Sequence, residues 1–167
     1  MTASAVREAT AGDAPRMAQI YQYYVRETVV TFELDDVPED VMAVRAERVQ
    51  QAGRPWLVIE TDSVVQGFAY AAPFRDRTAY QHSVETSVYL DQSALRKGLG
   101  MTIYGAVIDR LRGTDVHAAV ALVALPNAGS VALHERLGFV HAGTLRQVGR
   151  KFDQWIDVGY WQLTLTE

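Results

Sequence analysis

The stretch from Leu90 to Ile103 places a strand, a glycine-containing loop and a helix next to one another. A strand-like run, Ser83–Leu90, enters the loop, and a helix-like run, Leu99–Arg112, leaves it. Gly98 and Gly100 have no Cβ, so the backbone can turn tightly and a ligand can approach its amides. Because the first turn of a helix leaves N–H groups unpaired at the positive end of its dipole, this arrangement favours phosphate or pyrophosphate.

Two familiar phosphate-binding loops do not match this stretch. A dinucleotide fingerprint requires a third glycine three residues after Gly100, where this chain has Ile103. A P-loop requires Gly-Lys-Ser/Thr after four spacer residues, and the chain contains no such string. Two cations, Arg96 and Lys97, precede the first glycine. The glycines alone are also compatible with an ordinary strand-to-helix turn, so a second matching segment is needed.

The rest of the chain alternates between strand-like and helix-like patterns. We expect helices at 14–26, 38–52, 99–112 and 128–137, and strands at 5–9, 56–60, 64–72, 83–90, 117–125, 139–149 and 155–165. The strand 117–125 is almost wholly apolar, as expected for a central strand that is covered on both faces. This order predicts an α/β fold with a mixed central sheet and helices on both sides.

Composition limits the class of protein. A length of 167 residues suggests one domain, 1–167, and a net charge of −4 does not favour binding to nucleic acid. The chain has no cysteine, which excludes disulfides, thiolate metal ligands and a cysteine nucleophile. The residues 1–7 lack the apolar core of a signal peptide, and no apolar run reaches the ~18 residues of a membrane span. We therefore expect a soluble, cytoplasmic protein.

The segment Arg96-Lys97-Gly98-Leu99-Gly100 resembles the pyrophosphate loop of the GCN5-related N-acetyltransferases (GNAT), which reads Gln/Arg-x-x-Gly-x-Gly/Ala. The first position is Leu95 here, a departure that a loop binding mainly through backbone amides should tolerate. A second segment, 127–139, is similar to the family's Asn…Leu-Tyr-Glu-x-x-Gly-Phe pattern at the right distance from the loop. The resemblance implies the GNAT fold, with a mixed, mostly antiparallel central sheet flanked by helices.

Four stretches narrow the resemblance to the phosphinothricin and methionine sulfoximine/sulfone N-acetyltransferases: 28–33, 85–90, 130–135 and 155–162. Most of the superfamily has tyrosine at the position of His134, and histidine there is similar to this branch. The similarity covers nearly the whole chain. It implies transfer of an acetyl group from acetyl-CoA to an amine in a ternary complex, with no metal.

The resemblance also implies where acetyl-CoA binds. The backbone of one strand would hold the pantetheine arm, the amides of the glycine loop would hold the pyrophosphate, and the start of the next helix would contact the arm from the other side. The residues concerned are Val88, Tyr89 and Leu90; Arg96, Lys97, Gly98, Leu99, Gly100 and Met101; and Asn127 and Ser130.

Two side chains are candidates for proton transfer. An amine must be neutral to attack, and a free α-amine has a pKa of about 8, so a base is useful. Glu85 shares a strand face with Ser87 and Tyr89 and is our candidate base, acting directly or through water. His134 could protonate the departing thiolate or help to remove the amine's proton, but a packed helix histidine is an equally good interpretation.

Two arginines, Arg75 and Arg77, lie in a loop that precedes the Glu85 strand. The arginine fork matches a carboxylate, so this loop favours an acceptor that carries its own carboxylate, such as an amino acid. One or both arginines could also be solvated loop charges. Further side chains could form the walls of the acceptor site: Phe32, Glu33, Tyr80, Glu85 and Trp155.

Two other functions remain open from the sequence. The acceptor could be another amine, such as a polyamine or a protein N-terminus, which an acidic acceptor site would favour. Alternatively, the chain could be a non-catalytic acyl-CoA-binding module, although the presence of Glu85 and His134 argues against it. By resemblance, we also expect a homodimer in which the closing strands contribute to the contact.

Overall fold

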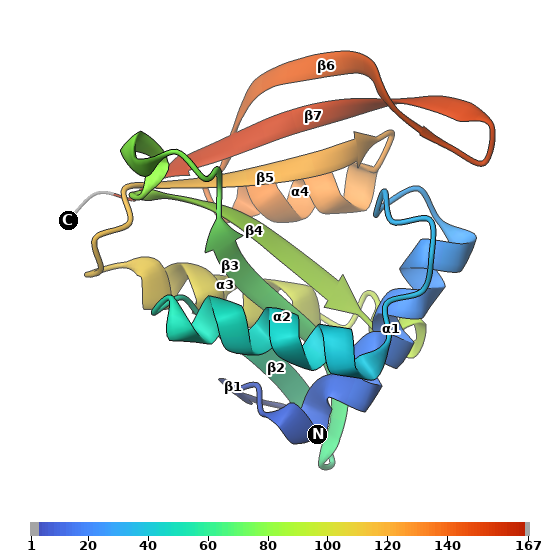
Figure 1. The fold of residues 1–167 in the computed structure, drawn as a ribbon, viewed down its shortest axis with the longest axis vertical. Helices are drawn as coiled ribbons and strands as arrows, with labels where there is room; N and C mark the ends of the chain where they lie inside the picture. The colour runs from blue at the N-terminus through green and yellow to red at the C-terminus, as the bar shows by residue number, and fades with distance from the viewer. Residues whose placement is uncertain (1–3, 166–167) are drawn as a thin grey trace.

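A computed structural model describes residues 4–165 of the chain. It contains seven strands and four helices, in the order that the sequence predicts (Figure 1). The strands are β1 (Ser4–Glu8), β2 (Trp56–Thr61), β3 (Val64–Pro73), β4 (Ser83–Leu90), β5 (Ala118–Leu125), β6 (Val140–Lys151) and β7 (Gln154–Thr164). The helices are α1 (Ala14–Glu27), α2 (Glu39–Gln51), α3 (Leu99–Leu111) and α4 (Ala128–Arg136). Short 3₁₀ turns occupy Ala11–Asp13, Thr78–Tyr80 and Gln92–Ala94.

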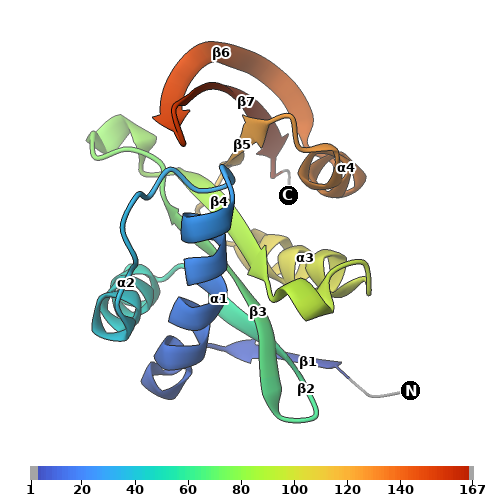
Figure 2. The same ribbon diagram turned by 90° about the vertical axis from the view of Figure 1, so that its right-hand side faces the viewer.

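The strands form one sheet in the order β1-β2-β3-β4-β5-β7-β6. Every neighbouring pair is antiparallel except β4 and β5, which run parallel. Their pairing covers only Ser83–Glu85 against Ala118–Val120. The two strands then diverge, so the sheet opens on the carboxyl side of Glu85 (Figures 1 and 2). The predicted mixed, mostly antiparallel sheet is confirmed, and this opening is its most useful feature for binding.

Helices cover both faces of the sheet (Figure 2). On one face, α1 and α2 pack with Trp56, Val58 and Phe68 in an apolar cluster. On the other face, α3 packs with Leu57 and Ile59, which alternate along β2 with the first set. The strand β4 follows the same alternation: Val84 and Val88 face α3, whereas Tyr89 faces α1. Glu85, an even number of residues from Tyr89, therefore lies on the α1–α2 face.

The boundaries agree with the sequence predictions to within one residue, except at the end of β6. Pro38 precedes α2 as its N-cap in extended backbone instead of taking its first helical position. The strand β6 continues to Lys151, two residues beyond the predicted end. The turn that follows uses Phe152 and Asp153, both with positive φ. Two-residue hairpin turns need such φ values and commonly use glycine or asparagine, so a turn built on Phe-Asp gave little signal in the sequence.

Candidate active site

A cavity of about 620 Å³ lies between the carboxyl end of β4, the glycine loop and α4. Eight of the predicted cofactor-binding residues line it: Val88, Leu90, Arg96, Gly98, Gly100, Met101, Asn127 and Ser130. They come from segments that are far apart in the sequence and that meet where β4 and β5 separate. This is the position that the sequence predicts for the coenzyme arm.

The glycine loop is shaped to bind an anion through its backbone. Gly98 is the N-cap of α3 and adopts the left-handed conformation with φ of +80°. A Cβ built on Gly98 would meet nothing within 4 Å, so the requirement there is conformational and the backbone is open to a ligand. The amides of the first turn of α3 have no partner within the helix, and Gly98, Gly100 and Met101 of this turn line the cavity. These donors fit the diphosphate of coenzyme A.

Alternate residues of β4 are hydrogen-bonded to β3, and the backbone groups of the other residues face the opening. Asp91 N donates to Gln66 O at 2.8 Å, and antiparallel partners exchange bonds at every second residue. Because the register is unbroken, Tyr89 and Phe68 form a hydrogen-bonded pair of the β3–β4 ladder, whereas Val88 and Leu90 belong to pairs that are not hydrogen-bonded to β3. Val88 and Leu90 direct their N–H and C=O groups into the gap between β4 and β5. The prediction that the Tyr89 backbone binds pantetheine is therefore corrected: its polar groups are used within the sheet.

Tyr24, a residue that the sequence analysis did not select, already contacts one of these positions. Its hydroxyl donates to Leu90 O at 2.6 Å and accepts from Leu90 N at 3.3 Å. Tyr24 also lines the cavity. A pairing of residues 66 positions apart leaves no local signal in the sequence.

The side chains of Lys97 and Leu99 do not line this cavity. They border a separate hollow of about 400 Å³ on the other side of the glycine loop, next to Ser93 and Ala94. Arg136, which the sequence analysis missed, does line the coenzyme cavity together with Arg96. Its only sequence signal is its place in the last turn of the helix that Asn127 begins. Two arginines at one cavity favour an anionic ligand.

Asn127 and Ser130 form the start of α4. The Asn127 Oδ1 atom accepts from Ser130 N at 3.1 Å and thereby caps the helix. An asparagine amide has donors as well as an acceptor, so its Nδ2 group can still donate a hydrogen bond to a ligand in the cavity. The sequence predicts this contact with pantetheine, and the position of Asn127 in the cavity lining is compatible with it.

His134 is buried, with 4% of its surface exposed, and it is not among the residues that line the cavity. Its ring packs edge-on against Tyr104 and Phe139, at centroid distances of 5.1 and 5.3 Å. Nδ1 lies 2.7 Å from Ser130 O, and because a carbonyl only accepts, Nδ1 carries the hydrogen. Burial lowers the pKa of His134, which favours the neutral ring with its lone pair on Nε2.

Glu85 is half-buried on the α1–α2 face of β4. Burial raises the pKa of its carboxyl, and the nearby Arg75 guanidinium partly offsets that rise. Tyr70 and Ser87 share this face and lie opposite each other in the β3–β4 register. Burial raises the pKa of Tyr70 to about 12, so this tyrosine stays protonated beside Glu85. Glu85 is a predicted site residue, whereas Tyr70, on the adjacent strand β3, has no local sequence signal for a place beside it.

The remaining predicted acceptor residues lie in the β3–β4 connection, in the α1–α2 connection and at the start of β7. Arg75 lies 3.9 Å from Glu85, donates to Phe74 O and stacks on the Phe74 ring, against which Tyr80 also packs. Arg77 is exposed at the start of the 3₁₀ turn. Glu33 pairs with Arg45 of α2, and Trp155 is 60% exposed under the Arg150 guanidinium. Phe32 packs on Gly149 of β6. The structure thus brings Arg75 to Glu85, whereas Arg77 stays at the surface.

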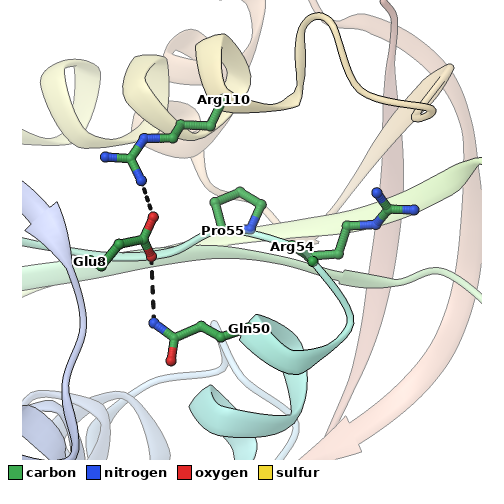
Figure 3. Close-up of a pocket in the computed structure, with 6 residues that line it drawn as sticks. Glu8, Gln50, Arg54, Pro55 and Arg110 are labelled. Atoms are coloured by element: carbon green, nitrogen blue, oxygen red, sulfur yellow. Dashed lines mark hydrogen bonds and ion pairs between the residues drawn. The ribbon is translucent and has the colours of Figure 1, made fainter.

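A further hollow of about 340 Å³ lies between the end of α2, β1 and α3 (Figure 3). Its charged groups are already paired with one another, since Glu8 accepts from Arg110 and from Gln50 (Figure 3). Arg54 pairs with Asp115. None of the predicted site residues lines this hollow, so it does not compete with the coenzyme cavity as the active site.

Within residues 4–165, no group of three histidine, aspartate or glutamate side chains is placed to hold a metal ion. In the same part of the chain, no helix combines the length and apolar character that a membrane crossing requires.

The fold and the coenzyme cavity are those of an acetyltransferase. The family model of the acetyltransferase (GNAT) domain matches residues 6–159, and the chain belongs to this family. It is therefore an acetyl-CoA-dependent N-acetyltransferase, as the sequence predicts.

Several members of this family are similar to the chain over nearly its whole length. The chain is 39% identical to a phosphinothricin N-acetyltransferase from Streptomyces viridochromogenes, over 94% of this chain and 85% of that protein. It is 34% identical to an L-methionine sulfoximine/L-methionine sulfone acetyltransferase from Salmonella typhimurium, over 97% and 95% of the two chains. A solved GNAT phosphinothricin acetyltransferase from Sinorhizobium meliloti, in complex with AcCoA, has a TM-score of 0.95 at 33% identity, covering 100% of this chain and 90% of that one. The predicted branch is confirmed by these names.

Proposed function

We propose that this enzyme transfers the acetyl group of acetyl-CoA to the α-amine of a small amino-acid-like acceptor of the phosphinothricin, methionine sulfoximine or methionine sulfone type. The relatives named above act on such compounds. The observation that carries the proposal is the position of Arg75, 3.9 Å from Glu85 on the α1–α2 face of β4. A guanidinium beside the base would hold the acceptor's carboxylate while its α-amine meets Glu85.

Acetyl-CoA would bind along the cavity that the glycine loop closes. Val88 would bond the pantetheine arm through its backbone, and Asn127 and Ser130 would contact it from α4. The backbone groups of Leu90 are bonded to the Tyr24 hydroxyl, so Leu90 would contact the arm as part of the cavity lining. The amides from Arg96 to Met101 would bind the diphosphate. The arginine side chains of residues 96 and 136 line the same cavity and supply positive charge to this anionic coenzyme.

The chemistry requires one new carbon–nitrogen bond and the removal of a proton from the amine. The acceptor nitrogen bonds to the thioester carbonyl carbon that acetyl-CoA supplies, and the carbon–sulfur bond breaks so that coenzyme A leaves as its thiolate, which takes a proton from solvent. The amine's proton passes to the Glu85 carboxylate, directly or through water. Holding both reactants in the opening between β4 and β5 can lower the barrier by up to ~7–11 kcal/mol, so no covalent intermediate is needed.

For His134, the geometry argues against the predicted role as the acid. With Nδ1–H bound to Ser130 O and a lowered pKa, the neutral ring has no proton on Nε2 to give. The ring is 4% exposed and packs on Tyr104 and Phe139, which supports the packed helix histidine that the sequence also allowed. We therefore propose that Glu85 alone accepts the amine's proton and that His134 does not protonate the thiolate.

The expectations on assembly and location stay proposals. Exposed apolar side chains gather on the β6–β7 hairpin, among them Leu145, Val148, Phe152 and Trp155, and support a homodimer through this hairpin. The net charge of −4 supports a small-molecule partner and not nucleic acid. We place the enzyme in the cytoplasm because its acetyl donor is an intracellular metabolite. Sedimentation analysis would test the dimer.

The decisive experiment is the release of coenzyme A in the presence of different amines. We expect turnover with L-methionine sulfoximine, L-methionine sulfone and phosphinothricin, and much slower turnover with spermidine or with a peptide that has a free N-terminus. No turnover with any of the three amino-acid analogues would overturn the proposed acceptor class. Faster turnover with the polyamine or the peptide would move the assignment to that acceptor.

A further inference from the structure

Lys151 is a buried lysine at the end of β6, with 3% of its surface exposed. Its Nζ donates to Thr31 O at 2.8 Å and to Tyr24 O at 3.4 Å. Both carbonyls belong to the end of α1 and the connection that follows it, more than 100 residues earlier in the chain. An ammonium group is costly to bury unless it is hydrogen-bonded, so these contacts define where the connection must lie.

A second contact holds the same connection against the hairpin. Phe32 covers Gly149 so closely that a Cβ at residue 149 would come within 2.2 Å of the Phe32 ring. Lys151 and Gly149 are therefore two adjacent attachment points on β6 for residues 28–33. Figures 1 and 2 show the connection between α1 and α2 rising towards the β6–β7 hairpin.

The connection also reaches the face of β4 that carries Glu85. Thr31 Oγ1 lies 2.6 Å from the Tyr21 hydroxyl, and the Tyr21 ring packs edge-on against Tyr89 at 4.9 Å. Tyr89 shares its strand face with Glu85. A continuous set of contacts thus runs from Lys151 through Thr31 and Tyr21 to the strand of the base.

We infer that Lys151 is a positioning residue for the acceptor: it fixes residues 28–33 against the β6–β7 hairpin and thereby sets the wall of the site that Phe32 and Glu33 form. This inference rests on the proposed function, which places the acceptor on the Glu85 face of β4. Lys151 does not touch the reacting atoms. It acts through the backbone carbonyls that it binds.

Lys151→Met tests the inference because methionine keeps the length of the side chain and removes the donors. Leaving the Thr31 carbonyl unpartnered should loosen the wall and raise the KM for L-methionine sulfoximine about tenfold. We expect kcat and the KM for acetyl-CoA to stay within about twofold, because a wall distant from the reacting atoms contributes uniform binding. In amide hydrogen exchange of the free enzyme, residues 28–33 should exchange faster while α3 keeps its protection.

Two further variants keep the test decisive. Gly149→Ala displaces Phe32 without touching the lysine, so it should also raise the acceptor KM, and it carries the test if Lys151→Met does not fold. Val49→Ala removes a buried side chain near the end of α2 and serves as the control for general destabilisation. We expect it to lower the melting temperature without separating the two KM values.

The outcomes distinguish this inference from the proposed function. If the acceptor KM changes no more than the acetyl-CoA KM, or if Lys151→Met behaves like Val49→Ala, the positioning role is wrong. If the wild-type enzyme turns over none of the amino-acid analogues, the proposed function fails. Hydrogen exchange at residues 28–33 then decides the role of Lys151: unchanged exchange overturns it, and faster exchange confined to that segment supports it.

Discussion

The guanidinium of Arg75 lies 3.9 Å from the carboxylate of Glu85, across the connection between β3 and β4. Burial raises the pKa of Glu85, and the Arg75 charge lowers it. Arg75 therefore has two tasks in the proposed mechanism: it keeps the base ionised and it offers donors to the acceptor's carboxylate.

Replacing Arg75 with glutamine should remove both of these effects and leave the coenzyme cavity unchanged. Without the cation, the pKa of Glu85 rises further, so the acidic limb of the kcat/KM profile should move to higher pH. The acceptor KM should also rise, while the affinity for acetyl-CoA stays the same. Steady-state kinetics from pH 5 to 9, with Arg77→Gln as the surface control, would check this. An unmoved acidic limb would show that Arg75 does not act on the base.

Glu85→Gln should reduce kcat by about 10²-fold or more, because the amide cannot accept the amine's proton. The affinity for acetyl-CoA should remain, since Glu85 faces α1 and α2 and does not line the coenzyme cavity. Calorimetric titration with acetyl-CoA and turnover with methionine sulfoximine would measure the two quantities. Glu47→Gln, an exposed change on α2, is the matched control. An unchanged kcat in Glu85→Gln would remove the base assignment.

The order of helices and strands, and the location of the coenzyme cavity, could be predicted because local patterns determine them. Alternation along β4 puts Glu85 and Tyr89 on one face, and the glycines at 98 and 100 indicate the turn before α3. The direction of individual side chains depended on distant partners. Tyr24 meets Leu90, and Lys151 meets Thr31, only after the sheet has assembled.

His134 shows the same limit within one helix. Leu133, the residue before it, lines the cavity, but one residue along a helix turns by about 100°, and the His134 ring packs on Tyr104 and Phe139. Lys97 likewise follows Arg96 in the loop yet borders another hollow. A family motif identifies such positions without fixing which way each side chain points.

Gly98→Ala should weaken acetyl-CoA binding through the backbone. Its φ of +80° is unfavourable for alanine by about 1 kcal/mol, although the added methyl meets nothing within 4 Å. The loop should relax and move its amides, which raises the KM for acetyl-CoA. Gly53→Ala is a close control, because Gly53 has a φ of +72°, is equally open and lies at the end of α2. Both variants should lose similar stability in urea, and only Gly98→Ala should lose coenzyme affinity. Equal affinities in the two variants would contradict a role for this loop.

The hydrogen bonds of Asp13 make the free energy of unfolding depend on pH in acid. Arg7 donates to both carboxylate oxygens at 2.8 and 2.9 Å, and Thr10 donates through its backbone and hydroxyl. These bonds lower the pKa of Asp13 from 3.8 to about 2 in the folded state. Because the unfolded chain binds the proton more readily, the stabilisation is complete above pH 3.8 and is lost as the pH falls through about 2. The shift corresponds to about 2 kcal/mol of unfolding free energy.

Asp13→Asn should therefore lower the free energy of unfolding by about 2 kcal/mol at pH 7, since the amide keeps the shape and loses the charge that Arg7 binds. The difference between variant and wild type should shrink as the pH falls from 4 to 2, where wild-type Asp13 becomes protonated too. Urea unfolding at several pH values would measure it. Asp36→Asn removes a carboxylate from the exposed pair with Arg26 and should change stability little, because solvent screens that pair. A difference between Asp13→Asn and wild type that does not depend on pH would show that packing, and not charge, makes Asp13 stabilising.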